Sequence, residues 1–184
     1  MWGYQPPALP LELGYGKSLH YCLHLISEKL KKGIELEQAV SKAVEEKFHL
    51  PFADSGRKKK LQEIAKRKLL DFTKKNIEDL KSIEETESRL EFPMESAIIS
   101  GRVDVIIKDK PNDKLEIRDY KTSEEVTTLE ESSFQLRLYT LGLRAIGKPI
   151  DRATIAYLED GRISPPVDIN DKGLEEAKNL AKGS

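Results

Sequence analysis

The stretch GRVDVIIKDKPNDKLEIRDYKTS, residues 101–123, decides the fold that the sequence predicts. Two runs of β-branched and apolar residues, 103–107 and 115–120, flank a polar segment that contains Pro111 and Asn112. Apolar runs joined by a short segment with Pro and Asn are typical of a β-hairpin. We therefore expect two neighbouring antiparallel strands here.

A turn centred on Pro111-Asn112 places Ile106 opposite Ile117 and Asp104 opposite Asp119. Residues directly opposite each other have Cβ atoms about 4.5–5.5 Å apart. Side chains alternate along a strand, so Lys121 shares a face with Asp119. The hairpin thus predicts two facing carboxylates with an ammonium group beside them.

Facing carboxylates repel each other, so this pair of aspartates needs a compensating charge. A divalent cation would supply it, because Mg²⁺ is commonly held by one or two carboxylates. The alternative is a solvated hairpin face on which Arg102 and Lys121 neutralise the aspartates, since surface ion pairs are common and weak. The hairpin residues leave both interpretations open.

The composition limits the classes of protein to consider. The 184 residues fit one domain, 1–184, large enough to bury its own core, and 38% hydrophobic with 34% charged residues suits a soluble protein. No apolar run approaches the ~20 residues of a membrane span, and there is no signal peptide. The single cysteine, Cys22, excludes an internal disulfide and a cysteine-held zinc or iron–sulfur cluster, which indicates a cytoplasmic setting. The net charge of −1 means that contact with nucleic acid requires a local basic surface.

Hydrophobic periodicity and turn signals predict the order of the elements. Prolines make 1–13 an extended lead-in, and residues 14–83 form a helical region with helices at 14–33, 36–48 and 57–83. The sheet core, 86–184, has strands at 87–94, 97–107, 115–121, 153–159 and 162–169, a helix at 129–146 and a last helix capped by Asp171. This order predicts an α/β fold with a mixed central sheet flanked by helices and a helical N-terminal region.

Two features of the helices bear on ligands. Gly16-Lys17-Ser18 is no phosphate-binding loop, because that motif needs a glycine where Leu11 stands, so we expect no nucleotide cofactor. The basic side of the helix at 57–83 is consistent with a DNA-tracking surface, but also with a solvated helix face. Its basic residues are Lys58, Lys59, Lys60, Lys66, Arg67, Lys68, Lys74 and Lys75.

Four separately placed elements resemble a known family. G-R-V-D-V followed by E-I-R-D-Y-K-T-S is similar to the PD-(D/E)XK nuclease signature, and more narrowly to the RecB-type nuclease domain at the C-terminus of UvrD-like DNA helicases. Gly16 to His20 has the form of the G-x-x-x-H element of that domain, and Gln135 to Tyr139 that of its Q-x-x-x-Y element. The resemblance covers most of residues 5–182 and implies a restriction-endonuclease-like core.

The resemblance implies a role for each matching residue. Asp104, Asp119 and His20 would bind Mg²⁺ or Mn²⁺ together with the carbonyl of Tyr120, and Lys121 would activate water or stabilise the transition state. Gln135 and Tyr139 would position the metal site or the DNA strand. Further DNA contacts are expected from Lys17, Arg102 and Arg137, with Arg144 as a weaker candidate.

Two residues near this pattern remain ambiguous. Glu87 stands where the family often has a glutamate ahead of the G-R-x-D strand, but an exposed strand glutamate explains it equally well. His24 lies one turn after His20, and we expect it to face elsewhere.

The predicted function is metal-dependent hydrolysis of DNA that is single-stranded or has an end, as the nuclease module of a repair or recombination helicase. A UvrD-like helicase motor, in the same chain or in a separate one, is the expected protein partner. One alternative is a catalytically silent DNA-binding or helicase-docking module of the same fold. Another is a structural domain whose charged hairpin face is merely solvated.

Overall fold

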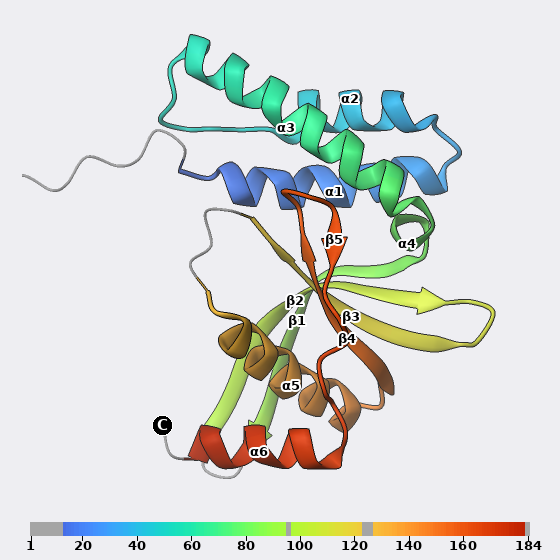
Figure 1. Cartoon of the computed structure of the whole chain (residues 1–184), viewed down its shortest axis with the longest axis vertical. Helices are drawn as coiled ribbons and strands as arrows, with labels where there is room; N and C mark the ends of the chain where they lie inside the picture. Colours follow the sequence, from blue (N-terminus) through green and yellow to red (C-terminus); the bar gives the residue numbers. More distant parts are fainter. Residues whose placement is uncertain (1–12, 95–96, 123–126, 183–184) are drawn as a thin grey trace, which may run out of the picture.

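A computed structural model describes residues 13–94, 97–122 and 127–182, so most of the expected extended lead-in lies outside the described residues. A central sheet separates an upper layer of helices from a lower one (Figure 1). The elements are α1 Tyr15–Lys31, α2 Leu36–Lys47, α3 Ser55–Lys75, α4 Ile77–Lys81, β1 Ile83–Met94, β2 Ala97–Asp109, β3 Lys114–Lys121, α5 Leu129–Ala145, β4 Ile150–Tyr157, β5 Arg162–Ile163 and α6 Asp171–Lys182. No helix in these ranges is long and apolar enough to cross a membrane.

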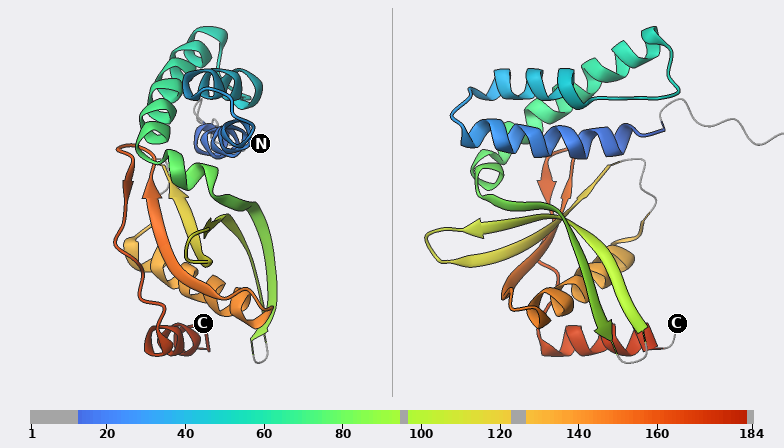
Figure 2. Two further views of the ribbon diagram at one scale, coloured as in Figure 1. Left: turned by 90° about the vertical axis from the view of Figure 1, so that its right-hand side faces the viewer. Right: turned by 180° about the vertical axis from the view of Figure 1, so that it is seen from behind.

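The sheet has five strands in the order β1-β2-β3-β4-β5. Neighbours are antiparallel except β3 and β4, which are parallel and are joined through α5. Parallel strands require such a crossover, because a tight turn cannot return the chain to the same end of the sheet. The predicted fold class, a mixed sheet flanked by helices with a helical N-terminal region, is confirmed (Figure 2).

Each face of the sheet buries its own hydrophobic core. Val105 belongs to the core beneath α1–α4, whereas its neighbour Ile106 belongs to the core over α5 and α6, as strand alternation requires. The upper core includes Leu19, Ile26, Leu69, Phe72 and Tyr120, and the lower core includes Ile117, Leu136, Leu143, Ile155 and Leu174. Both helical layers are therefore held against the sheet by burial of apolar surface.

The helical region differs from the prediction at its end. The expected helix at 57–83 is two helices, α3 and α4, because Asn76 interrupts it with φ −126° and donates its side-chain amide to the Phe72 carbonyl at 2.9 Å. The chain then enters β1 at Ile83, four residues before the expected strand. At α5 the prediction holds, because Thr128 and Glu131 form the capping box that the sequence indicates.

The two C-terminal strands differ from the ranges that the sequence predicts, since β4 lies earlier and β5 is shorter. β4 begins at Ile150, three residues before the expected position. β5 is limited to Arg162–Ile163, because Ser164 Oγ accepts the Ile155 N–H and prolines follow that cannot donate to the ladder. The cap of α6 is Asn170 rather than Asp171, since the Asn170 side chain accepts the Gly173 N–H at 2.9 Å.

A buried ion network ties the helical layer to the sheet. The Arg118 side chain on β3 is 5% exposed, and its Nη1 donates to Asp79 Oδ2 on α4 at 2.7 Å. Its Nη2 donates to Glu116 Oε1 at 2.8 Å and its Nε to Thr154 Oγ1 at 3.1 Å. Burial alone would lower the pKa of Arg118. The Glu116 and Asp79 carboxylates outweigh burial, so the pKa of Arg118 is raised above its ordinary value. The guanidinium thus stays charged inside the protein.

Arg118→Met is expected to lower the free energy of unfolding by about 3 kcal/mol, because it leaves the half-buried Glu116 carboxylate with only the more distant Arg152 Nε, at 3.5 Å, as a cation. The matched variant Asp79→Asn should cost only about 1 kcal/mol or less, since the Asp79 side chain is 44% exposed. Urea denaturation of the three proteins measures both effects. Equal losses in the two variants would contradict this assignment of the network.

Candidate active site

The central hairpin opens at Asp104. Its ladder runs from Asp109 opposite Lys114 to Val105 opposite Arg118, which confirms the predicted register. Beyond this last pair the Tyr120 N–H donates to the Asp104 side chain, with its Oδ2 at 2.7 Å, instead of to a backbone carbonyl of β2. A side chain thus replaces the backbone partner, and Asp104 occupies the fork where β2 leaves β3.

Burial and, after it, the neighbouring Asp119 carboxylate raise the pKa of Asp104 from its ordinary 3.8 to about 8. The hydrogen bond from the Tyr120 N–H opposes this rise. The side chain is only 16% exposed, so little water screens the repulsion between the two carboxylates. The predicted proximity of Asp104 and Asp119 is therefore present, although the two residues lie one step beyond the last ladder pair.

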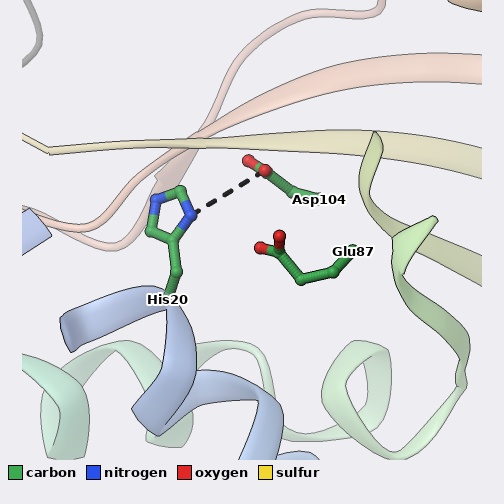
Figure 3. Close-up of side chains that lie close together, drawn as sticks. All are labelled: His20, Glu87 and Asp104. Atoms are coloured by element: carbon green, nitrogen blue, oxygen red, sulfur yellow. Dashed lines mark ion pairs between the residues drawn. The ribbon is translucent and has the colours of Figure 1, made fainter. Parts of the chain in front are cut away.

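His20 and Glu87 face Asp104 from two other elements (Figure 3). His20 Nδ1 on α1 lies 3.8 Å from Asp104 Oδ1. Glu87 lies on β1 between the pairs Thr86–Val105 and Ser88–Val103, hence next to Asp104 across the ladder. One ligand atom from each of these three side chains lies within 4.8 Å of the others.

The backbone at Glu87 is strained. Its φ of 52° lies in the left-handed region, which costs a residue with a Cβ atom about 1–2 kcal/mol. Such outliers persist where the surroundings hold them, and they are concentrated at functional sites. In this conformation the carboxylate points toward His20 and accepts a hydrogen bond from Arg102 Nη1 at 2.9 Å.

Asp119 and Lys121 lie together at the end of β3. Lys121 Nζ is 2.9 Å from Asp119 Oδ2, and the two side chains are 15% and 17% exposed. The ammonium group is thereby held beside the Asp104–Asp119 pair. Tyr120, between them, turns its ring to the opposite face, where it makes edge contacts with His20 and Phe72.

A cleft of about 410 Å³ opens next to these groups. Its walls come from α1, β1, β2 and α5, and hence from both helical layers. The lining residues are Lys17, His20, Tyr21, Glu87, Arg102, Asp104, Gln135 and Tyr139. Most of the residues that the sequence singles out therefore converge on one cleft.

Gln135 and Tyr139 form the wall on α5. Gln135 Nε2 donates to the Tyr139 hydroxyl at 2.7 Å, and the Arg102 N–H approaches the same oxygen at 3.4 Å. Gly101 makes this contact possible, because a Cβ atom there would lie 2.4 Å from Tyr139 Cε1. The glycine of the G-R-V-D-V element thus lets the tyrosine ring lie against the backbone of β2.

Other basic residues named from the sequence lie outside this cleft. Arg137 Nε donates to the Asp168 carbonyl at 2.9 Å, and Arg144 donates to the carbonyls of Ile150 and Ile169. On α3 several lysines are also engaged: Lys66 with Ser41, Lys68 with Glu159, Lys74 with Glu37, and Lys75 with the Asp160 carbonyl. The basic side of α3 is therefore partly neutralised. The cleft has Lys17 and Arg102 at its walls, and Arg102 is paired there with Glu87.

Glu87 is the residue of this cluster that the sequence does not single out as a metal ligand. Its proximity to His20 depends on strand pairing and on a left-handed backbone, and neither has a local sequence signal. His24, which was expected to face elsewhere, lies outside the cluster of His20, Glu87 and Asp104. Its Nδ1 lies 2.6 Å from Thr86 Oγ1 and its Nε2 3.5 Å from Glu28 Oε1.

A family model described as the PD-(D/E)XK nuclease superfamily matches residues 4–181. The chain belongs to the PD-(D/E)XK nuclease superfamily. Members of this superfamily are usually metal-dependent nucleases. The fork with Asp104, Asp119 and Lys121 thus lies in a fold that commonly cleaves phosphodiesters.

Solved structures similar to this superfamily member include the crystal structure of SSO0001, at 18% identity and a TM-score of 0.40, over 90% of this chain and 71% of that one. Another is the crystal structure of protein VC1899 from Vibrio cholerae, at 18% identity and a TM-score of 0.31. That match covers 93% of this chain and 50% of VC1899, so the chain spans half the length of that protein. No curated protein is a significant match.

The residues at the fork fit a divalent cation. Among the described residues, His20, Glu87 and Asp104 offer one imidazole nitrogen and two carboxylates within mutual reach of a single ion. Carboxylates suit Mg²⁺ and Mn²⁺, and an imidazole is accepted by transition metals. The raised pKa of Asp104 also means that a cation would relieve an existing repulsion.

The stability of the metal-free protein should depend on Asp104. Its pKa is about 8 in the folded protein and near 3.8 in the unfolded chain, so between these values the folded state binds the extra proton. The free energy of unfolding contributed by this group therefore falls as the pH rises through that window. Asp104→Asn removes the titrating group and should unfold with a flatter pH dependence.

Urea denaturation in EDTA, at pH values between about 4 and 8, measures this difference. We expect the variant to gain stability relative to the unmodified protein as the pH rises. Two stability curves that stay parallel across the window would contradict the raised pKa.

Gly101→Ala should destabilise the fold by about 1–3 kcal/mol, because the new methyl group overlaps the Tyr139 ring. The same change should cost much less in a Tyr139→Ala background, where the ring is gone. A double-mutant cycle by urea denaturation measures the coupling, with Gly56→Ala as a helix control that has room for a methyl group. Equal costs in both backgrounds would show that the close approach is not what requires glycine.

Proposed function

We propose that this protein is a metal-dependent deoxyribonuclease that hydrolyses DNA phosphodiester bonds. The observation that carries the proposal is the convergence of His20, Glu87 and Asp104 within 4.8 Å at the β2–β3 fork. The ion pair of Asp119 with Lys121 lies beside them, and the cleft is large enough for a small ligand. Membership in a superfamily of nucleases gives this arrangement its chemical context.

His20, Glu87, Asp104 and Asp119 would hold one or two Mg²⁺ or Mn²⁺ ions, with the Tyr120 carbonyl as a further ligand. When bound, a divalent ion lowers the pKa of a coordinated water and neutralises charge on a phosphate. The imidazole in the ligand set favours Mn²⁺ over Mg²⁺, because Mg²⁺ prefers ligands made of oxygen alone.

Other side chains of the cleft and fork would stabilise the transition state and bind the DNA. The Lys121 ammonium, held by Asp119, stabilises the negative charge that develops on the phosphate during attack. Lys17 and Arg102 at the cleft walls bind the flanking phosphates as point and planar cations. Gln135 fixes the Tyr139 hydroxyl, and this pair positions the DNA strand against β2.

We further propose the RecB-type subgroup and action alongside a UvrD-like helicase motor in DNA repair or recombination. The supporting features are the four separately placed elements that contain His20, Asp104, Asp119 with Lys121, and Gln135 with Tyr139. A helicase partner would deliver unwound strands to the cleft. Arg137 remains a predicted DNA contact, and its place outside the cleft would restrict it to a more distant part of the strand.

Asp104→Asn, Glu87→Gln and Lys121→Ala should each lower DNA cleavage in Mn²⁺ by at least about 100-fold, because each removes charge from the reacting site. Glu91→Gln, an exposed glutamate on β1, should cleave normally. End-labelled linear and circular single-stranded DNA, with Mn²⁺, with Mg²⁺ or with EDTA, provide the assay. Cleavage of the linear form alone would indicate that an end is required.

Full metal-dependent activity in Asp104→Asn or Lys121→Ala would contradict the proposed site. DNA binding without any cleavage in Mn²⁺ would instead favour the catalytically silent DNA-binding module.

A further inference from the structure

One aromatic ring lines the cleft without serving the core. Tyr21 follows His20 on α1, and 39% of its surface is exposed. The core positions of this part of α1 are filled by Leu19, Cys22 and Leu23, each at most 1% exposed. The Tyr21 ring is therefore available to a ligand in the cleft.

The position of Tyr21 relates it directly to the reacting groups. Consecutive Cα atoms are about 3.8 Å apart, and consecutive helical side chains diverge by about 100°. His20 turns toward Asp104, and Tyr21 lines the same cleft as these two residues. A strand whose scissile phosphate lies at Asp104 would pass through this cleft, where a neighbouring base can reach the ring.

Cationic groups accompany the ring. Lys17 lies one turn earlier on α1, and its Nζ is 5.7 Å from the centre of the Tyr21 ring. Arg102 on β2 contributes a guanidinium to the wall of the same cleft. An aromatic face for a base, with cations for the phosphates on either side, is the combination by which proteins bind single-stranded DNA.

A duplex cannot use such a ring in the same way. Inside a double helix both faces of each base are covered by the neighbouring bases, so stacking on a side chain requires a base that has left the stack. Unpaired or frayed DNA supplies that base at lower cost than an intact duplex. The aromatic wall of the cleft therefore favours DNA with unpaired bases over an intact duplex.

We propose that Tyr21 stacks on the base next to the scissile phosphate and thereby makes the enzyme prefer single-stranded DNA. This inference rests on the proposed nuclease function. Tyr21 contacts the substrate and selects it, whereas Asp104, Glu87 and Lys121 act at the phosphate.

Tyr21→Ala should raise KM for a single-stranded oligonucleotide about 5- to 150-fold with little change in kcat, which corresponds to the loss of one stacked base. Tyr21→Phe and Tyr21→Trp keep an aromatic face, so their KM should stay close to that of the unmodified protein. Phe52→Ala, which removes an exposed ring between α2 and α3 that does not line the cleft, is the matched control and should behave like the unmodified protein.

An abasic oligonucleotide tests the contact from the side of the DNA. Removing the base next to the cleaved bond should raise KM for the unmodified protein, but should have little further effect on Tyr21→Ala. A purely structural role of Tyr21 would not produce this coupling with a single base. Thermal unfolding and Mn²⁺ titration of Tyr21→Ala, expected to be unchanged, confirm that the fold and the metal site are intact.

The outcomes separate the two proposals. If the unmodified protein cleaves no DNA in Mn²⁺, the proposed nuclease function fails and this inference fails with it. If it cleaves DNA, but Tyr21→Ala discriminates intact from abasic oligonucleotides as the unmodified protein does, stacking is refuted and the nuclease function stands. An equal loss in Tyr21→Phe would also refute stacking, because it would assign the effect to the hydroxyl group.

Discussion

The central constraint on this structure is the concentration of acidic groups in a place with little water. The Asp104 carboxylate fills the fork of two strands, next to Asp119, and Glu87 approaches it from β1. Only part of the resulting repulsion is compensated within the protein, by the Tyr120 N–H, Lys121 and Arg102. The left-handed backbone of Glu87 and the raised pKa of Asp104, which comes first from burial and then from Asp119, both occur at this place. Such an arrangement is stable only because the surrounding cores hold the strands in place.

The sheet brings two separate layers to one site. His20 comes from the upper layer, which the core around Leu69 and Phe72 holds to the sheet, and Tyr139 comes from the lower layer. Neither layer alone forms the cleft, since its walls belong to α1, β1, β2 and α5. The Arg118 network reinforces this assembly, because it links α4 to the strand that also carries Asp119.

The parts of the site governed by local geometry could be predicted from the sequence. Strand alternation and a short turn were enough to place Asp104 near Asp119, because the register of a hairpin follows from its turn. Helical spacing was enough to place Gln135 beside Tyr139, and a family resemblance supplied His20. The predicted register is confirmed, and only the length of the ladder differs, because the Asp104 carboxylate accepts the Tyr120 N–H and the ladder ends one pair before Asp104 and Asp119.

The rest depended on contacts between distant segments. The approach of Glu87 to His20 requires the pairing of β1 with β2 and a left-handed residue inside a strand, and neither has a local signal at a glutamate. The place of Arg137 outside the cleft depends on a distant contact too, because its Nε donates to the Asp168 carbonyl. The break at Asn76 likewise reflects contacts of its side chain with the Phe72 and Gly161 carbonyls.

The distribution of the acidic and basic groups along the chain has a consequence for synthesis. A ribosome releases the chain from its N-terminus, so His20 and Glu87 emerge well before Asp119 and Lys121, and the Tyr139 wall emerges last. Every shorter nascent chain lacks part of the cleft. The cleft can therefore form only after residue 139 has left the ribosome, because its walls include side chains from Lys17 to Tyr139.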